Sequence, residues 1–440
     1  LYSGVENALG ADQVDVLIGS AAVNTLLGFF GDDQLLGGSG ADSLLGGRDN
    51  DTLIGGSGAD LVDGAAGADD FALYLGSIGG VQVNLGDGLL ESGFDAAGDL
   101  LTGIEHLVGS DFADVLTGDG NVNRLYGESG ADQLAGGASA DGLFGGSGAD
   151  AVFYDALDTA VIGGVGRDTL VGTSAADAIQ MNAARFTFAG AFASFERIDL
   201  GDGNDFFNGS TNAADFGTIL GAGITVFGGS GNDAINMRGN GALVGIDDEL
   251  DGGDGNDNLW GGTGSDGLVG GSGNDNLYGG SGDDNLGGGE GFDVVYVGRD
   301  EGDDLIKGSE GLVLFWGNNH GSGFYNGVDP SEISIEYTGT EVVISLLDES
   351  SSVTNTVRFE MSAVEIINLF DFGNGDAGNG GAPPPSYARD IYSASWDSGT
   401  QTFTAFTKVV DGREARGLPV RWALPRRRRG GTRRSAYPRM

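Results

Sequence analysis

The chain has 440 residues, of which 87 are glycine, and 65 acidic residues against 21 basic ones give a formal net charge of −44. The absence of cysteine excludes disulfide scaffolds, thiolate metal sites and cysteine nucleophiles. The acidity argues against nucleic acid as a partner of most of the chain, because an acidic surface repels phosphate.

A nine-residue period is the main feature of the first 296 residues. Two degenerate units start at Gly10 and Gly19, and regular arrays then cover residues 28–72, 109–153 and 252–296, with isolated units between the last two arrays. In every unit the sixth place is Asp or Asn and the eighth is Leu, Val, Ile or Phe. Such self-similarity at a fixed period is typical of a solenoid.

Each unit is interpreted as a turn followed by a short strand. Glycine in the first four places permits the positive φ angles that a turn needs, and the last three places alternate around one apolar residue. Two units, 18 residues, then make one coil, and successive coils stack about 4.8 Å apart. Leu35, Leu44 and Leu53 are expected to point inward and form part of a narrow core.

The sixth-place carboxylates indicate a metal site. Asp33 and Asp51, or Asp257 and Asp275, lie 18 residues apart and are expected to stack on one edge of the coil. Stacked carboxylates repel, and one buried residue in nine makes a small core, so folding is expected to depend on a divalent cation. An all-oxygen, flexible ligand set favours calcium over zinc or copper.

The repeat resembles the haemolysin-type calcium-binding nonapeptide of RTX proteins, GGxGxDxUx. The closest matches are GGSGADSLL from Gly37, GGSGNDNLY from Gly270 and GGSGDDNLG from Gly279. The resemblance implies an all-β fold: a right-handed parallel β-roll or β-helix solenoid with several bound Ca²⁺ ions, followed by a small antiparallel β cap. It also implies that loop carbonyls and sixth-place aspartates of stacked coils bind the calcium.

Carried over unit by unit, the resemblance assigns seventeen metal ligands. They are Asp33, Asp42, Asp51, Asp60, Asp69, Asp114, Asp132, Asp141, Asp150, Asp168, Asp205, Asp233, Asp257, Asp266, Asp275, Asp284 and Asp293. Asn24 and Asn123 occupy the same place without a charge and are therefore not included. The loop that contains Asp49 lacks glycine in its fourth place, which departs from the motif.

Composition and period divide the chain into eight segments. They are a first array (1–72), spacer coils (73–108), a second array (109–153), degenerate coils with isolated units (154–251), a third array (252–296), a β-rich cap (297–372), a Gly/Pro linker (373–386) and a C-terminal region (387–440). Residues 411–440 hold ten Arg against two acidic residues, a net charge of +8, so the other 410 residues carry −52. This Arg-rich tail is expected to be disordered.

The sequence contains no recognisable catalytic constellation. Its two histidines, His106 and His320, lie far apart and outside any HExxH motif, and no GxSxG motif occurs. The chain is therefore predicted to be no enzyme but a secreted, calcium-binding structural or cell-surface protein, such as part of an S-layer, adhesin or matrix. The resemblance implies type I secretion, and calcium is the expected partner, with self-assembly or surface glycans as further candidates. The alternative is a C-terminal module of an extracellular hydrolase or toxin whose catalytic domain lies upstream of Leu1.

Overall fold

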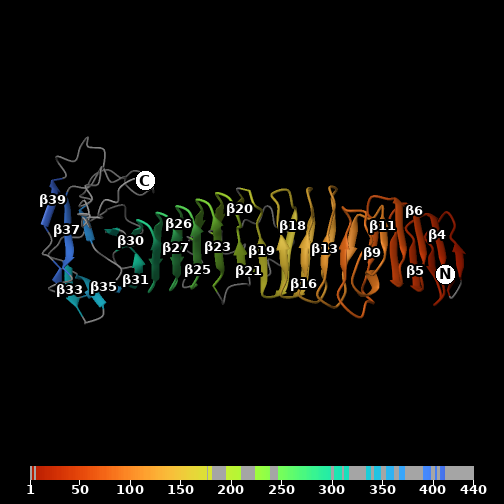
Figure 1. Cartoon of the computed structure of the whole chain (residues 1–440), viewed down its shortest axis with the longest axis horizontal. Helices are drawn as coiled ribbons and strands as arrows, with labels where there is room; N and C mark the ends of the chain where they lie inside the picture. The colour runs from red at the N-terminus through yellow and green to blue at the C-terminus, as the bar shows by residue number, and fades with distance from the viewer. Residues whose placement is uncertain are drawn as a thin grey trace, which may run out of the picture.

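The computed structural model is an elongated stack of β coils with a further group of strands at the C-terminal end (Figure 1). It describes residues 2–3, 6–175, 177–180, 195–209, 223–237, 246–298 and 302–309, and the later strands named below. Within these residues the only helix is a single 3-10 turn, η1 (Phe94–Ala96). No described helix is long and apolar enough to span a bilayer. The predicted all-β solenoid is thus confirmed.

The described strands form four sheets. Nine strands form the first: β1 (Tyr2–Ser3), β3 (Val16–Ile18), β5 (Gln34–Ser39), β7 (Thr52–Ser57), β9 (Phe71–Leu73), β12 (His106–Val108), β14 (Arg124–Tyr126), β16 (Gly142–Gly148) and β18 (Ala160–Gly166). Five form the second: β2 (Asn7–Leu9), β4 (Thr25–Phe30), β6 (Ser43–Arg48), β8 (Leu61–Ala66) and β11 (Leu100–Thr102).

The other two sheets continue the stack. Fourteen strands form the third: β10 (Gln82–Asn84), β13 (Val115–Thr117), β15 (Gln133–Ala135), β17 (Ala151–Phe153), β19 (Asp168–Val171), β21 (Phe195–Asp199), β23 (Thr225–Ser230), β25 (Glu249–Asp254), β27 (Gly267–Ser272), β29 (Asn285–Glu290), β31 (Asp303–Ser309), β33 (Ile333–Tyr337), β34 (Glu341–Leu347) and β35 (Val353–Glu360). The fourth holds β20 (Ala178–Gln180), β22 (Phe206–Asn208), β24 (Ala234–Asn236), β26 (Asn258–Thr263), β28 (Asn276–Ser281), β30 (Val294–Gly298), β32 (Leu312–Trp316), β36 (Ile366–Asp371), β37 (Asp390–Asp397), β38 (Thr402–Phe403) and β39 (Thr407–Asp411).

The regular arrays have the predicted 18-residue coil. Leu35 pairs in parallel with Leu53, and Leu259 pairs with Leu277, so each strand contacts the strand two units later in the chain. Strands of opposite sheets alternate along the chain and enclose one inward residue per unit. Leu35, Leu44 and Leu53 are fully buried, as predicted, and belong to one continuous core that extends to Ile306.

The coil lengthens where the nonapeptide pattern is weak. His106 pairs with Phe71, 35 positions earlier, around an excursion that contains β10 and η1. Farther along, Phe206 pairs with Ala178 at a separation of 28, and Asn258 pairs with Ala234 at a separation of 24. The inward positions stay in register across these insertions, because an outward loop can grow without changing which side chains face the core.

Antiparallel pairing replaces the parallel stack near the C-terminal end. β33 pairs with β34, β34 with β35, and β36 with β37, all antiparallel, while β35 and β36 still pair in parallel with β31 and β32 of the roll. An antiparallel cap was predicted, but with other bounds than 297–372: the parallel roll continues through β31 and β32, and β37 and β39 of the predicted C-terminal region join the antiparallel strands. The cap occupies the end of the solenoid where open strand edges would otherwise invite further pairing. The Gly/Pro linker at 373–386 and the Arg-rich tail after residue 411 lie outside the described residues.

Candidate metal centre

Sixteen of the seventeen predicted ligands lie in two columns that follow the length of the roll. Each of these aspartates lies at the start of a strand, and each is 97–100% buried, with exposed fractions of 0–3%. One column precedes the strands of the first and fourth sheets, and the other precedes the strands of the second and third. The sixteen are Asp33, Asp42, Asp51, Asp60, Asp114, Asp132, Asp141, Asp150, Asp168, Asp205, Asp233, Asp257, Asp266, Asp275, Asp284 and Asp293.

One carboxylate oxygen of every column residue has the same hydrogen-bond partner. The Oδ1 atom accepts the backbone N–H of the residue at the equivalent place one coil earlier, at 2.7–3.1 Å. Asp51, for example, accepts from Asp33, and Asp275 accepts from Asp257. The columns are therefore ladders of hydrogen bonds between side chains and backbone that join successive coils. The sequence analysis did not predict these bonds.

The second carboxylate oxygen is buried without a donor in most loops. The Oδ2 atoms concerned belong to Asp33, Asp42, Asp51, Asp60, Asp70, Asp132, Asp141, Asp150, Asp205, Asp233, Asp257, Asp266, Asp275 and Asp293. Backbone carbonyls lie beside them: a Cβ atom built on Gly252 would lie 2.5 Å from both Asp257 Oδ2 and the carbonyl oxygen of Gly270. The carboxylate oxygen and the carbonyl oxygen are both acceptors, and Oδ2 has no donor, so the two oxygens could bind a cation.

Burial makes these carboxylates costly to ionise without a cation. It raises the pKa of Asp51, Asp132 and Asp257 to about 7 and that of Asp60 and Asp293 to about 6, against an ordinary value of 3.8. In each case desolvation is the largest cause, and it outweighs the backbone hydrogen bond to Oδ1, which lowers the pKa. A bound divalent cation would reverse this balance because it favours the charged form.

The donor set suits calcium. Within the described ranges, no three carboxylate or histidine side chains converge on one point, so a cation in a column would take most of its ligands from loop carbonyls. Calcium accepts six to eight oxygen ligands, including backbone carbonyls, in flexible geometry. The residues present therefore fit the metal that the sequence predicts, with the sixth-place carboxylates supplying the charge.

Asp69 is the predicted ligand that the structure places elsewhere. Its side chain is half exposed, lies 2.8 Å from His106 Nε2 and 3.0 Å from Arg124 Nη1, and its pKa is lowered, first by the hydrogen bond from His106. The fully buried column residue is its neighbour Asp70, whose Oδ1 accepts the N–H of Asp51, 19 positions earlier. This unit has ten residues, so a strict nine-residue period predicts Asp69 as the column residue instead of Asp70.

The same shift moves Phe71 out of the predicted inward position. Ala72 points into the core instead, while the Phe71 ring lies 4.6 Å from the imidazole of His106. His106 is 1% exposed, and its Nδ1 accepts the backbone N–H of Arg124. His106 is therefore a buried structural histidine.

The nine-residue period also failed to predict three column residues in irregular coils. Asp99, Asp248 and Asp304 are buried, and their Oδ1 atoms accept from Asp60, Ile224 and Asp284 respectively. Each is followed two residues later by a buried apolar side chain, as in Asp99-Leu100-Leu101. That short pattern, without the glycines, is the signal that could have found them.

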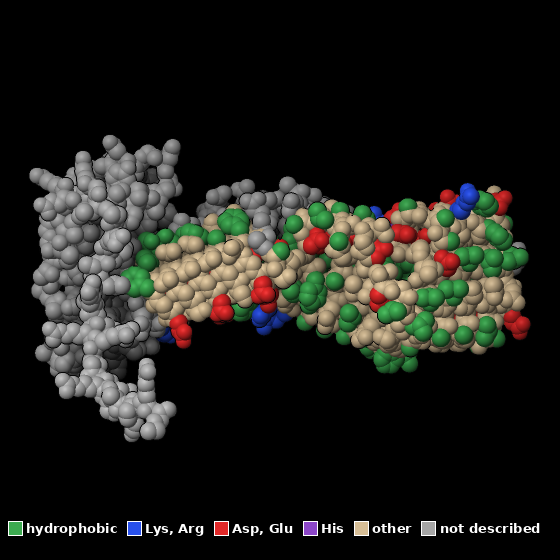
Figure 2. Space-filling model, turned by 45° about the horizontal axis from the view of Figure 1, so that its top comes forward, with side chains coloured by type: hydrophobic (Ala, Val, Ile, Leu, Met, Phe, Trp, Pro, Cys, Tyr) green, Lys and Arg blue, Asp and Glu red, His purple; other side chains and the backbone are tan. Residues whose placement is uncertain are grey.

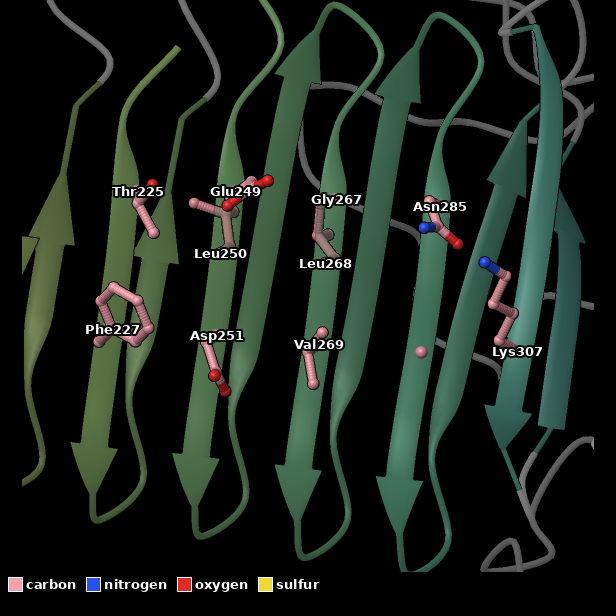
Figure 3. Close-up of a pocket in the computed structure, with 11 residues that line it drawn as sticks. Thr225, Phe227, Glu249, Leu250, Asp251, Gly267, Leu268, Val269, Asn285 and Lys307 are labelled. Atoms are coloured by element: carbon pink, nitrogen blue, oxygen red, sulfur yellow. The ribbon is translucent and has the colours of Figure 1, made fainter. Parts of the chain in front are cut away.

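A shallow groove of about 430 Å³ crosses the outer face of the third sheet (Figure 3). Asp251 and Val269 lie along its length and Lys307 lies at one end. Gly267 and Gly287 also line the groove and have no side chain to fill it. Its charged lining residues are Glu249, Asp251 and Lys307.

Comparison with known families agrees with the geometry. The family model for the RTX calcium-binding nonapeptide repeat matches residues 9–44, 36–71, 101–134, 117–152, 247–268 and 260–295. No curated protein matches the chain. The matched residues contain the loops that build the buried carboxylate columns. Over these three stretches, 9–71, 101–152 and 247–295, the chain consists of RTX calcium-binding nonapeptide repeats.

Proposed function

We propose that this chain is a secreted structural or cell-surface protein that folds when it binds calcium outside the cell. The observation that carries the proposal is the set of buried Oδ2 atoms without a donor. An unpaired buried carboxylate is strongly destabilising, and here it recurs along both edges of one core. Bound calcium would supply the positive charge that these columns lack.

The compartment follows from the affinity expected of such loops. Extracellular calcium modules bind at roughly 10⁻⁴–10⁻³ M, so the columns would be empty where calcium is scarce and filled outside the cell. Binding to the folded state alone adds its free energy to folding. Type I export of an unfolded chain, followed by folding outside, is consistent with this order of events.

The structural role is supported by the shape and by the residues that occupy the roll. The strands in Figure 1 repeat along one axis in a long stack, and such a repeat suits a spacer or an assembly unit. We assign no catalytic step to this chain, because His106, the histidine within the described ranges, is buried between Asp69, Arg124 and Phe71.

The test compares the purified chain in EDTA with the chain in millimolar CaCl₂. Circular dichroism measures the β signal, and sedimentation measures the hydrodynamic radius. We expect little β signal and a large hydrodynamic radius in EDTA, and a full β signal in calcium. Millimolar MgCl₂ serves as the control, because magnesium demands near-octahedral geometry and holds its water more firmly. A β signal already complete in EDTA would show that folding does not depend on the ion.

The role at the cell surface needs a separate measurement. Electron microscopy of the calcium-loaded protein should show ordered sheets, fibres or end-to-end contacts at high concentration. A uniformly monomeric rod under all conditions would instead favour the alternative function, a folding module of a larger secreted protein.

A further inference from the structure

The loops of the roll fall into two classes that differ in the orientation of one peptide group. In the first class, here called open loops, the second residue has a positive φ angle and the sixth-place Oδ2 has no donor. Those second residues are Phe29, Gly38, Gly47, Gly56, Ala65, Glu128, Gly137, Gly146, Gly201, Gly229, Gly253, Gly262, Gly271 and Gly289.

In the second class, here called self-capped loops, the second residue donates its backbone N–H to the sixth-place side chain. Ala11 donates to Asp15 Oδ2 at 2.7 Å, Ser110 to Asp114 Oδ2 at 2.6 Å, and Thr173 to Asp177 Oδ2 at 2.7 Å. Two further loops have an asparagine in the sixth place: Ser20 donates to Asn24 Oδ1 and Asp119 donates to Asn123 Oδ1. None of these second residues has a positive φ angle.

Glycine content separates the two classes. Every open loop has glycine in its second or fourth place, whereas the five self-capped loops have glycine in neither. A positive φ is easily reached by glycine and costs other residues about 1–2 kcal/mol. Phe29, Ala65 and Glu128 nevertheless adopt it, at φ angles of 81°, 68° and 72°, in loops whose fourth place is glycine.

The two asparagines show that the sixth place of a self-capped loop does not require a charged side chain. Asn24 Nδ2 donates to the carbonyl of Glu6, and Asn123 Nδ2 donates to the carbonyl of Glu105, while each Oδ1 accepts from the loop. Their side chains are thus paired at both ends by the protein itself. A loop of this kind accepts an uncharged residue because both ends of the sixth-place side chain have hydrogen-bond partners within the protein.

We propose that the self-capped loops do not bind calcium, and that the residues in the second and fourth places decide which loops of this roll do. This inference rests on the proposed calcium binding. The amide hydrogen on Oδ2 occupies the lone pair that a cation would use and presents positive charge to it. Asp114, a predicted ligand, would accordingly take no part in calcium binding, whereas Asp132, one coil later, would.

Each run of open loops starts beside self-capped ones. Loops 10–15 and 19–24 precede the run at 28–72, loops 109–114 and 118–123 precede the run at 127–153, and loop 172–177 precedes the coils from residue 200 onward. The first open loops of each run therefore follow coils whose sixth-place side chains already accept the N–H of the second residue.

The experiment converts a self-capped loop into an open one and counts ions by native mass spectrometry of the whole chain in CaCl₂. Ser110→Gly combined with Phe112→Gly should bind one more calcium ion than the wild type. The matched control, Ser110→Ala with Phe112→Ala, removes the same side-chain contacts but keeps both φ angles negative, and should bind the wild-type number. Thr173→Gly with Ala175→Gly repeats the test in a second loop.

Two further variants each replace one aspartate by asparagine. They test the inference even if the loops with added glycine fail to fold. Asp132→Asn should lower the number of bound ions, whereas Asp114→Asn should leave it unchanged. Equal losses from both variants, or equal gains in the glycine and alanine pairs, would overturn the inference while leaving calcium binding intact. A wild type that binds no calcium would instead overturn the proposed function itself.

Discussion

At the scale of single residues, the column aspartate has two separate tasks. Its Oδ1 joins neighbouring coils through a backbone N–H, and in the open loops its Oδ2 has no donor and is available to a cation. In Asp275 the Oδ1 accepts the backbone N–H of Asp257. Its Oδ2 and the carbonyl oxygen of Gly288 both face Gly270, where a Cβ atom would contact the two oxygens. Substitutions can therefore separate the stacking of coils from the binding of metal.

Asp275→Asn should keep the first task and lose the second. The remaining Oδ1 can still accept from Asp257, and an NH₂ group in place of Oδ2 can donate to the carbonyl of Gly288. We expect a larger β signal than that of the wild type in EDTA, because a buried charge is removed, and a smaller increase in that signal on adding calcium. Circular dichroism with EDTA and then with calcium measures both.

The matched control for this substitution is Asp254→Asn, which changes the net charge equally on an exposed side chain that accepts from Ser272 Oγ. It should leave the calcium response unchanged. If Asp254→Asn reduced the response as much as Asp275→Asn, overall charge rather than the buried column would govern folding.

At the scale of strands, in-register parallel pairing stacks identical places above one another. Trp260, Tyr278 and Tyr296 occupy the ninth place of alternate units and lie on β26, β28 and β30. Their ring centroids are 5.3 and 4.0 Å apart, with interplanar angles of 13° and 6°. The three rings therefore form one stack that reinforces the third array from outside the core.

Tyr278→Ala should lower the melting temperature of the calcium-loaded protein, because it removes the central ring from a three-ring stack. We expect a loss of about 1–3 kcal/mol, from the stacking contribution of about 0.5–1.5 kcal/mol per pair and the lost apolar contact. Tyr278→Phe is the control and should behave like wild type. Calorimetry in excess calcium measures the difference; an equal loss in both variants would assign the effect to the hydroxyl instead.

At the scale of the whole molecule, the net charge of −44 describes the surface poorly. Many of the acidic groups lie in the columns and are buried, and Figure 2 shows acidic side chains scattered over the visible face of the roll. The electrostatic cost of folding is thus concentrated inside, where salt screens it weakly. A specific ion or a proton can relieve it.

Acidification should therefore partly replace calcium. The folded pKa values of about 6 for Asp60 and Asp293 and about 7 for Asp51 and Asp257 exceed the unfolded value of 3.8. Between about pH 4 and 7 the folded metal-free chain binds more protons than the unfolded chain, so its stability rises as the pH falls through this window. The β signal in EDTA should increase from pH 7.5 to pH 5.

The measurement is circular dichroism in EDTA across this pH range at low protein concentration. In excess calcium the trend should weaken or reverse, since protons and calcium compete for the same oxygens. A metal-free β signal that stayed constant or fell on acidification would contradict the burial of ionisable columns.

The sequence by itself determined the 18-residue coil, the inward leucines and sixteen of the column aspartates, because a repeat fixes the facing of every side chain as long as its length is constant. Only the tertiary structure decided between Asp69 and Asp70, since that choice depends on His106 and Arg124, 37 and 55 residues away. Glycine in the second or fourth place separates the two loop classes, and this pattern can be found in the sequence. Only the tertiary structure showed what the pattern controls, because the amide of a self-capped loop is seen to donate to Oδ2 only in the folded loop.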